Sequence, residues 1–293
     1  MRILICGGYG FIGNRLLSYL LNKGCEIFTL SHRAHEPIPG VHEFVYENFE
    51  QIKLLSLISE INPDCTVFLA TQYDNGDLDK IIDVNIKLPS MLMKAISRLP
   101  ESQRNFVMTD SYWSLGSKES KGIPLDDYAA AKGAVKEFAK TYSYYNKVKI
   151  INLMVYGTYG NGDRRGKILD VILDAVRDKK EIHLTAGEQY IDLVHVDDVC
   201  SAYLRAIEYL FNSALDSNNS FCTFAVGSSS PIQLKEIIAK IGKKYDVSMI
   251  HTGTKEYRER ELFHPQYEHS SVPGWFPEYD LWSYIDDYLT ELK

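Results

Sequence analysis

The sequence predicts an α/β protein built on a doubly wound parallel sheet, with a smaller lobe formed by the C-terminal part of the chain. Two observations lead to this prediction. Apolar runs with the length of buried strands alternate with helical segments as far as residue 155, which is the order that a parallel sheet requires. After residue 157 the alternation becomes less regular, which indicates a second structural unit.

Composition and charge limit the class of protein. The chain has 293 residues, of which 45% are apolar and 24% charged, an ordinary balance for a globular protein with a large core. No apolar run approaches the ~20 residues that cross a bilayer, and no signal-peptide pattern opens the chain, so we expect a cytoplasmic protein without membrane contact. A net charge of −7 argues against a nucleic-acid partner. The cysteines show neither CxxC pairing nor histidine clustering, so we expect no metal site and buried thiols at Cys6, Cys25, Cys65, Cys200 and Cys222.

The first apolar run, Arg2–Cys6, has the pattern of a buried strand, and it ends in a turn in which glycines recur as GxxGxxG. One glycine allows the sharp exit from the strand, one lets the backbone approach a pyrophosphate, and one lets the following helix pack closely on the sheet. The helix expected at 11–23 then directs its N-terminus at the phosphates. We therefore expect a dinucleotide site, with cofactor contacts from Gly7, Tyr9, Gly10, Phe11, Ile12 and Gly13.

The end of the second expected strand, 26–30, indicates which dinucleotide binds. A carboxylate at this place accepts hydrogen bonds from the ribose 2′-hydroxyl and repels a 2′-phosphate. Ser31 stands there instead, followed by His32 and Arg33. The missing carboxylate and the neighbouring basic residues favour NADP(H) over NAD(H) as the cofactor. The alternative is a solvated loop that carries an arginine by chance.

The remaining elements of the first 156 residues follow from apolar runs and turn residues. Pro89 interrupts a long helix, and Asn85 on this helix either ties two strand ends together or is an exposed polar residue. Asp126 or Asp127 caps the next helix. We expect strands at 42–46, 66–70, 104–108 and 149–155 and helices at 51–60, 78–99 and 126–146.

From residue 157 onward the pattern indicates a separate lobe. A loop over 158–167, rich in glycine and asparagine, carries Arg164, Arg165 and Lys167. We expect helices at 168–178, 197–210 and 231–243, strands at 182–184, 190–195 and 221–226, a polar loop at 212–220 and a short last helix from Asp280. The prediction is therefore a dinucleotide-binding domain over 1–156 and a substrate-binding lobe over 157–293, with the chain crossing between the two.

Two residues of the helix expected at 126–146 have the spacing of an acid/base site. Tyr128 and Lys132 are four residues apart, so both side chains lie on one helix face. A free tyrosine has a pKa of ~10 and exchanges protons poorly near neutrality unless a cation such as Lys132 stabilises its phenolate. Ser111 adds a hydroxyl at the sheet edge where ligands bind in open α/β folds. In combination with the glycine turn, this set outweighs the interpretation of a surface helix pair.

Short segments along nearly the whole chain carry the motifs of one enzyme family. They are GGYGFIG at 7–13, TVFLAT at 66–71, VN at 84–85, YAAAK at 128–132, VYG at 155–157, DLVHVDDV at 192–199, FAVGS at 224–228, YRERE at 257–261 and GWFPEYDL at 274–281. In these segments the chain resembles the extended short-chain dehydrogenase/reductase family, in particular its nucleotide-sugar reductases and epimerases. The resemblance implies a Rossmann-type fold. It is strongest for small 4-ketosugar reductases of the CDP-paratose and CDP-abequose synthase type.

The resemblance also implies roles for single residues. Tyr128 is the acid/base, Lys132 its partner and Ser111 the third member of the catalytic set. Arg258, in an RxxE pattern with Glu261, clamps the diphosphate of a nucleotide-sugar substrate. The other candidates that it implies are Leu69, Ala70 and Thr109 at the cofactor and Thr71, Tyr112 and Lys167 at the substrate.

The chain departs from the family pattern at the phosphate site. The family usually has an arginine where Ile191 stands, so phosphate binding depends on Arg258, with Lys167 or Arg165 as further candidates or as plain solvated residues. Ala131 replaces a common serine, which costs little.

A dehydratase relative would carry Thr-Asp-Glu at the end of the fifth strand, and Thr109 and Asp110 are the first two of these types. Counting from the flanking residues puts Ser111 at the catalytic hydroxyl and leaves Tyr112 and Trp113 where the acid and base would stand. We therefore reject the dehydratase. Tyr112 and Trp113 fit a wall of the sugar pocket, with a core position as the alternative for Trp113.

The predicted reaction is the NADPH-dependent reduction of the C4 keto group of a nucleotide-linked 4-keto-6-deoxy or 4-keto-3,6-dideoxy sugar, a step toward surface polysaccharides such as O-antigen or toward glycosides. The alternative is a nucleotide-sugar 4-epimerase with tightly bound NAD. A third hypothesis, a dinucleotide-binding regulatory protein without turnover, fits poorly with an intact set of Ser111, Tyr128 and Lys132.

The resemblance further implies a homodimer in which the helices at 78–99 and 126–146 pair with those of a second copy. Apolar residues on these helices fit either such an interface or the core of one chain; they are Leu88, Met91, Leu92, Val135 and Phe138.

Overall fold

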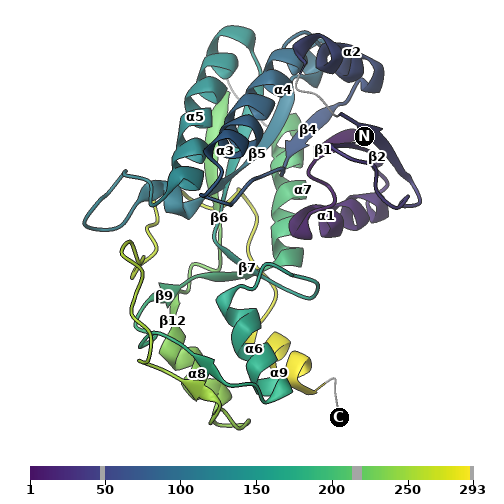
Figure 1. Cartoon of the computed structure of the whole chain (residues 1–293). Helices are drawn as coiled ribbons and strands as arrows, with labels where there is room; N and C mark the ends of the chain where they lie inside the picture. The colour runs from purple at the N-terminus through teal and green to yellow at the C-terminus, as the bar shows by residue number, and fades with distance from the viewer. Residues whose placement is uncertain (47–49, 213–219, 291–293) are drawn as a thin grey trace.

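The computed structural model describes residues 1–46, 50–212 and 220–290. Within these residues the main sheet has seven strands in the order β11-β6-β5-β4-β1-β2-β3, and all neighbouring strands run parallel (Figure 1). The order leads outward from β1 in both directions, which confirms the doubly wound α/β fold class. The strands are β1 (Arg2–Cys6), β2 (Glu26–Ser31), β3 (Val41–Val45), β4 (Cys65–Phe68), β5 (Asn105–Ser111), β6 (Lys149–Val155) and β11 (Phe221–Val226).

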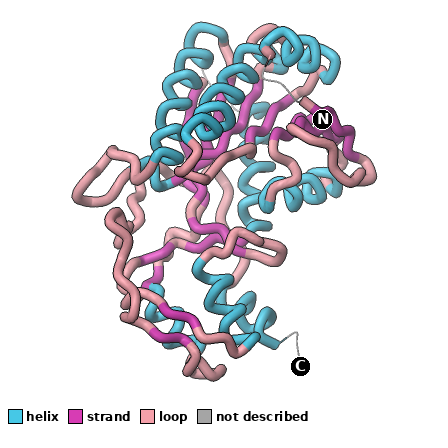
Figure 2. The backbone as a smooth tube through the Cα atoms, in the orientation of Figure 1, coloured by secondary structure: helices cyan, strands magenta, loops and turns pink. Residues whose placement is uncertain are grey.

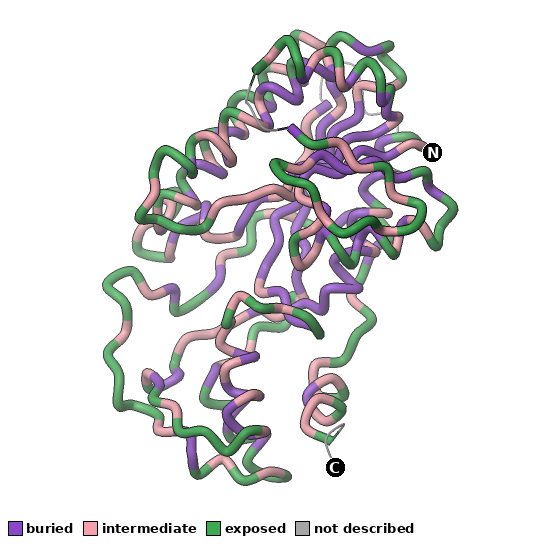
Figure 3. The backbone as a smooth tube through the Cα atoms, turned by 45° about the vertical axis from the view of Figure 1, so that its right-hand side comes forward, coloured by how far each residue is buried: buried purple, intermediate pink, exposed green. Residues whose placement is uncertain are grey.

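Helices cover both faces of this sheet because successive residues of a strand point to opposite faces (Figure 2). Ile3 and Ile5 belong to a core with α1 (Phe11–Asn22) and α7 (Val196–Asn212). Leu4 and Cys6 belong to the opposite core, with residues of α2 (Gln51–Ile61), α4 (Leu88–Ile96) and α5 (Asp127–Asn146). The buried residues consequently concentrate in the strands of the sheet and on the helix faces that contact it (Figure 3).

The long helix expected at 78–99 changes its winding midway. α3 (Leu78–Ile82) runs into a π-helical turn, Asp83–Lys87, which continues into α4. The sequence places the interruption at Pro89, but Pro89 lies in the first turn of α4, where a proline is tolerated. The π turn precedes it and contains the buried Asn85.

α5 is the helix that carries Tyr128 and Lys132. Asp126 caps it, since its Oδ1 accepts a hydrogen bond from the backbone N–H of Ala129 at 2.8 Å. The helix ends at Lys147 in the left-handed conformation. Of the helices in the described part of the chain, α5 included, none is both long and apolar enough to span a membrane.

The second lobe packs around its own hydrophobic core, formed by α6 (Ile168–Asp178), α8 (Leu234–Ile241) and α9 (Leu281–Thr290). The strand expected at 190–195 is broken at Asp192, and a short strand opens the segment expected as a loop at 158–167. Six short strands of two or three residues in the described part of this lobe pair into three two-stranded sheets. They are β7 (Gly157–Tyr159) with β10 (Leu193–His195), β8 (Ile182–His183) with β13 (Ile250–His251), and β9 (Tyr190–Ile191) with β12 (Ile232–Gln233).

The chain returns from this lobe to the main sheet, where α7 packs on α1 and β11 pairs with β6 over its whole length (Figure 1). The division into two domains at residue 157 stays a prediction. The polar loop expected at 212–220 falls largely on residues outside the described part of the chain.

Buried aspartates fasten the C-terminal segments to the rest of the molecule. Asp192 accepts hydrogen bonds from the backbone N–H groups of Ser228 and Ser229 at 2.6 and 3.1 Å and from the phenol of Tyr267 at 2.7 Å. Asp198, the third residue of α7, accepts from the backbone N–H groups at 278 and 279. Asp192 and Asp198 of the DLVHVDDV segment therefore hold loops in place, whereas Asp197 pairs with Arg15 of α1.

The apolar residues that fit either a dimer interface or the core of one chain do not all lie in the same environment. Met91, Leu92 and Val135 are buried in the core of this chain, so an interface role for them is wrong. Leu88 is half-buried against the same core. Phe138 on α5 is 47% exposed and stays available for contact with a second copy.

Candidate functional site

The glycine turn between β1 and α1 is closed by contacts that leave no room for side chains at two of its glycines. Gly7 has φ of +87°, and a Cβ there would lie 2.4 Å from the backbone nitrogen of Ala70. A Cβ at Gly13 would lie 2.2 Å from the carbonyl oxygen of Gly7. At Gly10 the nearest atom to such a Cβ is 3.5 Å away, so this side of the turn is open. The geometry matches the sharp exit, the close helix and the accessible backbone expected of a pyrophosphate-binding turn.

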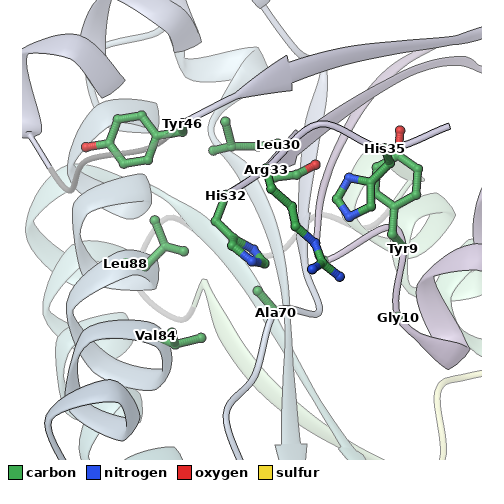
Figure 4. A pocket seen from close by; sticks show the side chains of 12 residues that line it. Tyr9, Gly10, Leu30, His32, Arg33, His35, Tyr46, Ala70, Val84 and Leu88 are labelled. Atoms are coloured by element: carbon green, nitrogen blue, oxygen red, sulfur yellow. The ribbon is translucent and has the colours of Figure 1, made fainter. Parts of the chain in front are cut away.

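A cavity of about 270 Å³ opens beside this turn at the carboxyl ends of β1 and β2 (Figure 4). Figure 4 shows the side chains of His32 and Arg33 extending toward it, with Ala70 and Val84 on the opposite wall. It lies at the carboxyl edge of the sheet, where ligands bind in open α/β folds. The residues that line it are Gly7, Tyr9, Gly10, Leu30, Ser31, His32, Arg33, His35, Tyr46, Ala70, Val84 and Leu88.

A carboxylate that the sequence analysis missed lies beside this cavity. Glu43 comes from β3, and its Oε1 accepts hydrogen bonds from Ser31 Oγ at 3.1 Å and from His35 Nδ1 at 2.8 Å. Its Oε2 accepts from the backbone N–H of His35 at 3.2 Å. The hydrogen bond from His35 is the main cause that lowers the pKa of Glu43. The second strand thus ends without a carboxylate of its own, but a neighbouring strand supplies one.

Ser111, Tyr128 and Lys132 come together at the carboxyl edge of the sheet. Ser111 is the last residue of β5 and is buried. Tyr128 lies in the first turn of α5, and the Ser111 hydroxyl is close enough to oppose the rise in its pKa that burial causes. The Lys132 ammonium lies 5.8 Å from the centre of the Tyr128 ring. The predicted catalytic residues are therefore neighbours in space.

Burial controls the protonation of this set. It raises the pKa of Tyr128, and the Ser111 hydroxyl opposes that shift only partly, so the phenol keeps its proton at neutral pH. Burial also lowers the pKa of Lys132 to about 8, against the attraction of Asp110. A protonated phenol next to a cation can donate a proton to an oxygen that gains negative charge.

Behind Ser111 lies a buried polar cluster around Asp110. Its carboxylate accepts hydrogen bonds from the backbone N–H of Ser111 at 2.8 Å and from Asn152 Nδ2 at 3.1 Å, and Lys136 lies 3.0 Å away. Thr109, predicted at the cofactor, donates to the carbonyl of Phe68 at 2.9 Å and shares a hydrogen bond with Tyr203. These contacts fix the end of β5.

Asn85 holds the loop that follows β4. Its Oδ1 accepts from Thr71 Oγ1 at 3.1 Å and from the backbone N–H of Gln72 at 2.9 Å, and its Nδ2 donates to the Gln72 carbonyl. Asn85 is therefore not an exposed polar residue. The other expectation, that it ties two strand ends together, holds in part, because Asn85 ties the end of one strand, β4, to a helix. Thr71, predicted at the substrate, has its hydroxyl in this network. Leu69 and Ala70 precede it, and their N–H groups donate to the Cys6 carbonyl.

Aromatic rings line the side of the site that faces the second lobe. Tyr112 stacks on Tyr156 with a centroid distance of 4.8 Å, and Tyr156 stacks on Tyr267 at 5.1 Å. Arg258 lies over the ring of Trp113, 5.2 Å from its centre, and pairs with Glu261 at 3.1 Å. The structure thus brings Arg258, from the distant C-terminal part of the sequence, next to the residues that follow Ser111.

Arg165 and Lys167 of the 158–167 segment have partners of their own. Arg165 forms an ion pair with Asp163 at 2.5 Å and covers the ring of Phe11, whose centre is 4.8 Å away. Lys167 donates to Thr158 Oγ1 at 3.1 Å, and burial, together with the charge of Arg165, lowers its pKa to about 8. Arg165 therefore contacts the glycine turn, and its guanidinium already has a carboxylate partner.

A model of the NAD dependent epimerase/dehydratase family matches residues 3–216. The chain belongs to this family. The resemblance to the extended short-chain dehydrogenase/reductases is thereby confirmed, and the protein is an NAD(P)-dependent oxidoreductase.

Relatives within the NAD dependent epimerase/dehydratase family align over almost the whole chain. A CDP-abequose synthase from Yersinia pseudotuberculosis is 30% identical over 93% of this chain and 94% of its own. A UDP-glucose 4-epimerase from Rhizobium leguminosarum bv. trifolii is 22% identical, with 95% and 93% covered. Among solved structures, MoeE5 in complex with UDP-glucuronic acid and NAD superposes with a TM-score of 0.80 at 18% identity, covering 98% of this chain and 97% of MoeE5. The solved structures show the fold that this member shares.

The sequence does contain one signal for the position of Glu43 beside the second strand. In a parallel sheet, residues opposite each other on neighbouring strands are close, and Glu43 lies opposite Thr29 of β2. Its side chain lies only two residues before the end of β2. A third strand at 42–46 that pairs with the second strand brings Glu43 near Ser31. The residues at the end of the second strand do not show this by themselves.

Proposed function

We propose that the protein is an NADPH-dependent reductase that acts on the C4 keto group of a nucleotide-linked 4-keto-6-deoxy or 4-keto-3,6-dideoxy sugar. The observation that carries the proposal is the meeting of Ser111, Tyr128 and Lys132 at the same sheet edge as the cavity lined by His32 and Arg33. The CDP-abequose synthase relatives, which align nearly end to end, support a nucleotide-sugar substrate.

In the proposed reaction, NADPH supplies a hydride to the sugar C4. Ser111 donates a hydrogen bond to the carbonyl oxygen and orients it. Tyr128 gives its proton to this oxygen as negative charge develops, so that the charge is neutralised where it forms. Lys132 then stabilises the phenolate that remains. Ser111 and Lys132 are buried and Tyr128 is half-buried, so little water competes for these interactions.

An NAD-dependent 4-epimerase is the second candidate, and one observation favours it. The Glu43 carboxylate lies beside Ser31, near the place where NAD-binding proteins hold the ribose hydroxyls. UDP-glucose 4-epimerases are also among the relatives. We prefer the reductase because both Glu43 oxygens already accept hydrogen bonds and His32 and Arg33 reach the cavity.

A cofactor balance distinguishes the two reactions. Purified enzyme is mixed with one equivalent of NADPH and a 4-keto-6-deoxy or 4-keto-3,6-dideoxy sugar nucleotide, and the absorbance of reduced nicotinamide is followed. The reductase consumes one NADPH per sugar reduced. Interconversion of C4 epimers without net consumption of cofactor would overturn the proposal.

Cofactor preference has its own test at Arg33. Arg33→Ala removes the guanidinium at the cavity, so the Kd for NADPH should rise much more than the Kd for NADH, measured by nicotinamide fluorescence. Arg98→Ala, which removes a distant exposed arginine, should change neither. An equal effect of Arg33→Ala on both cofactors would show that Arg33 does not contact the 2′-phosphate. We also propose a cytoplasmic location, where NADPH is available.

A further inference from the structure

The loop that follows β2 is folded back onto the glycine turn. The ring of His35 stacks on the ring of Tyr9 with a centroid distance of 3.8 Å and an angle of 8° between the planes. Figure 4 shows the two rings overlapping at the edge of the cavity, next to Arg33. The position of His35 is therefore set by a residue that lies inside the GxxGxxG motif.

Glu43 fixes the same ring from the other side. It accepts hydrogen bonds from both the backbone N–H and Nδ1 of His35, and each of the two side chains is 19% exposed. A hydrogen bond at Nδ1 determines which nitrogen is left for other partners, so Nε2 is the atom with which His35 can bind a ligand.

Glu43 is poorly suited to bind the ribose itself. Oε1 accepts from Ser31 and His35, and Oε2 accepts from the His35 backbone. A ribose-binding carboxylate accepts from both the 2′- and the 3′-hydroxyl, and these three hydrogen bonds leave Glu43 only one of its roughly four acceptor positions. The contacts of Glu43 go instead to the segment Ser31–His35, in which every side chain with a basic group lines the cavity.

We propose that His35 is a binding residue for the 2′-phosphate of NADPH, oriented by Glu43 and by the stack on Tyr9. The proposal rests on the NADPH preference proposed above. His35 then completes a cluster with His32 and Arg33, and each group donates to phosphate oxygens. Glu43 acts as a positioning residue, since its oxygens contact His35 and Ser31.

Binding of 2′,5′-ADP and of 5′-AMP separates this role from a structural one, because the two compounds differ only in the 2′-phosphate. Isothermal titration calorimetry on the full chain gives both Kd values. Wild type should bind 2′,5′-ADP more tightly. His35→Ala should reduce the ratio of the two affinities by about tenfold or more, the range for a hydrogen bond to a charged group. Glu43→Gln should reduce it in the same direction by a smaller factor.

Matched variants make the result specific. Glu36→Gln removes an exposed carboxylate from the same loop and should leave both affinities unchanged. His35→Gln keeps an N–H donor and should recover part of the ratio of the two affinities. This variant also tests the proposal if His35→Ala does not fold. Thermal unfolding is measured for each variant.

Two results would overturn the assignment. An equal loss of affinity for both compounds in His35→Ala would mean that His35 only maintains the turn. A gain in 2′,5′-ADP affinity in Glu43→Gln would mean that Glu43 reads the ribose directly. Failure of the proposed cofactor preference is a separate outcome, because wild type would then bind 5′-AMP as tightly as 2′,5′-ADP.

Discussion

Lys136 and Asp110 form an ion pair at 3.0 Å next to Ser111, whose backbone N–H donates to the Asp110 carboxylate. The Asp110 side chain is fully buried, whereas that of Lys136 is 20% exposed. Because Asp110 also accepts a hydrogen bond from the Ser111 backbone, the pair lies under the residue that is to orient the substrate carbonyl.

Lys136→Met should destabilise the protein by about 3–5 kcal/mol, since it removes the ion-pair partner of the buried Asp110 carboxylate. The free energy of unfolding is measured in urea. The control is Lys140→Met one helical turn further on, which removes an exposed pair with Glu137 and should cost less than about 1 kcal/mol. An equal loss in the free energy of unfolding for the two substitutions would show that the buried pair stabilises the protein no more than the exposed pair does.

Tyr128→Phe should lower kcat by ~10²-fold or more, because the ring still packs and only the transferable proton is lost. The Kd for NADPH should stay nearly the same. Tyr145→Phe, at a 75% exposed tyrosine of the same helix, provides the comparison and should leave turnover unchanged. Retention of more than about a hundredth of the activity in Tyr128→Phe would contradict an acid/base role.

The pH dependence of turnover should show the titration of Lys132. Its pKa is lowered to about 8 by burial, so the side chain is charged below this pH and neutral above it. In the proposed mechanism this charge stabilises the Tyr128 phenolate, so kcat/KM should be level near neutrality and fall as the pH rises through about 8. Initial rates at saturating NADPH test this. A profile that stays flat up to pH 10 would exclude Lys132 as the controlling group.

Arg258→Ala should weaken binding of the nucleotide sugar by roughly 1.5–3 kcal/mol, the value of a charge-assisted hydrogen bond to the diphosphate. The effect should appear in KM and in the Kd of a nucleoside diphosphate, with kcat less affected. Lys255→Ala removes an exposed charge from the same segment and serves as the control. Unchanged affinity in Arg258→Ala would remove this residue from the substrate site.

The expected homodimer depends on an apolar surface of α5. Phe138 is 47% exposed on this helix, and Phe138→Asp should shift the protein toward monomer because a charge in a packed interface is costly. Light scattering coupled to size-exclusion chromatography gives the mass. A monomer mass for wild type at micromolar concentration would contradict the dimer.

The sequence contains enough local information for the parts of the site that lie on one element or one turn. Gly7, Gly10 and Gly13 predict a turn whose backbone can approach a phosphate, and the spacing of Tyr128 and Lys132 predicts a shared helix face; both arrangements are present. Strand and helix bounds agree within a few residues where apolar runs are long, as in β1 and β6.

Contacts between distant segments could not be predicted in this way. Glu43 reaches Ser31 from a neighbouring strand, and Lys136 reaches Asp110 from a helix to a sheet. Neither contact follows from a regular spacing along the sequence, as the shared helix face of Tyr128 and Lys132 does. The break at Asp192 has the same origin, because its carboxylate is used by a loop 36 residues later, at Ser228. Tertiary hydrogen bonds of this kind decide where short strands end.

The pairing of β11 with β6 has a consequence for how the protein can be produced. Without residues 221–226, β6 would be the outer strand of the sheet, and all its side chains from Ile150 to Val155 are apolar except Asn152. An open apolar edge invites pairing with other chains. A fragment that stops near residue 156 should therefore aggregate, and during synthesis on the ribosome the edge stays uncovered until residue 226 has emerged from the exit tunnel.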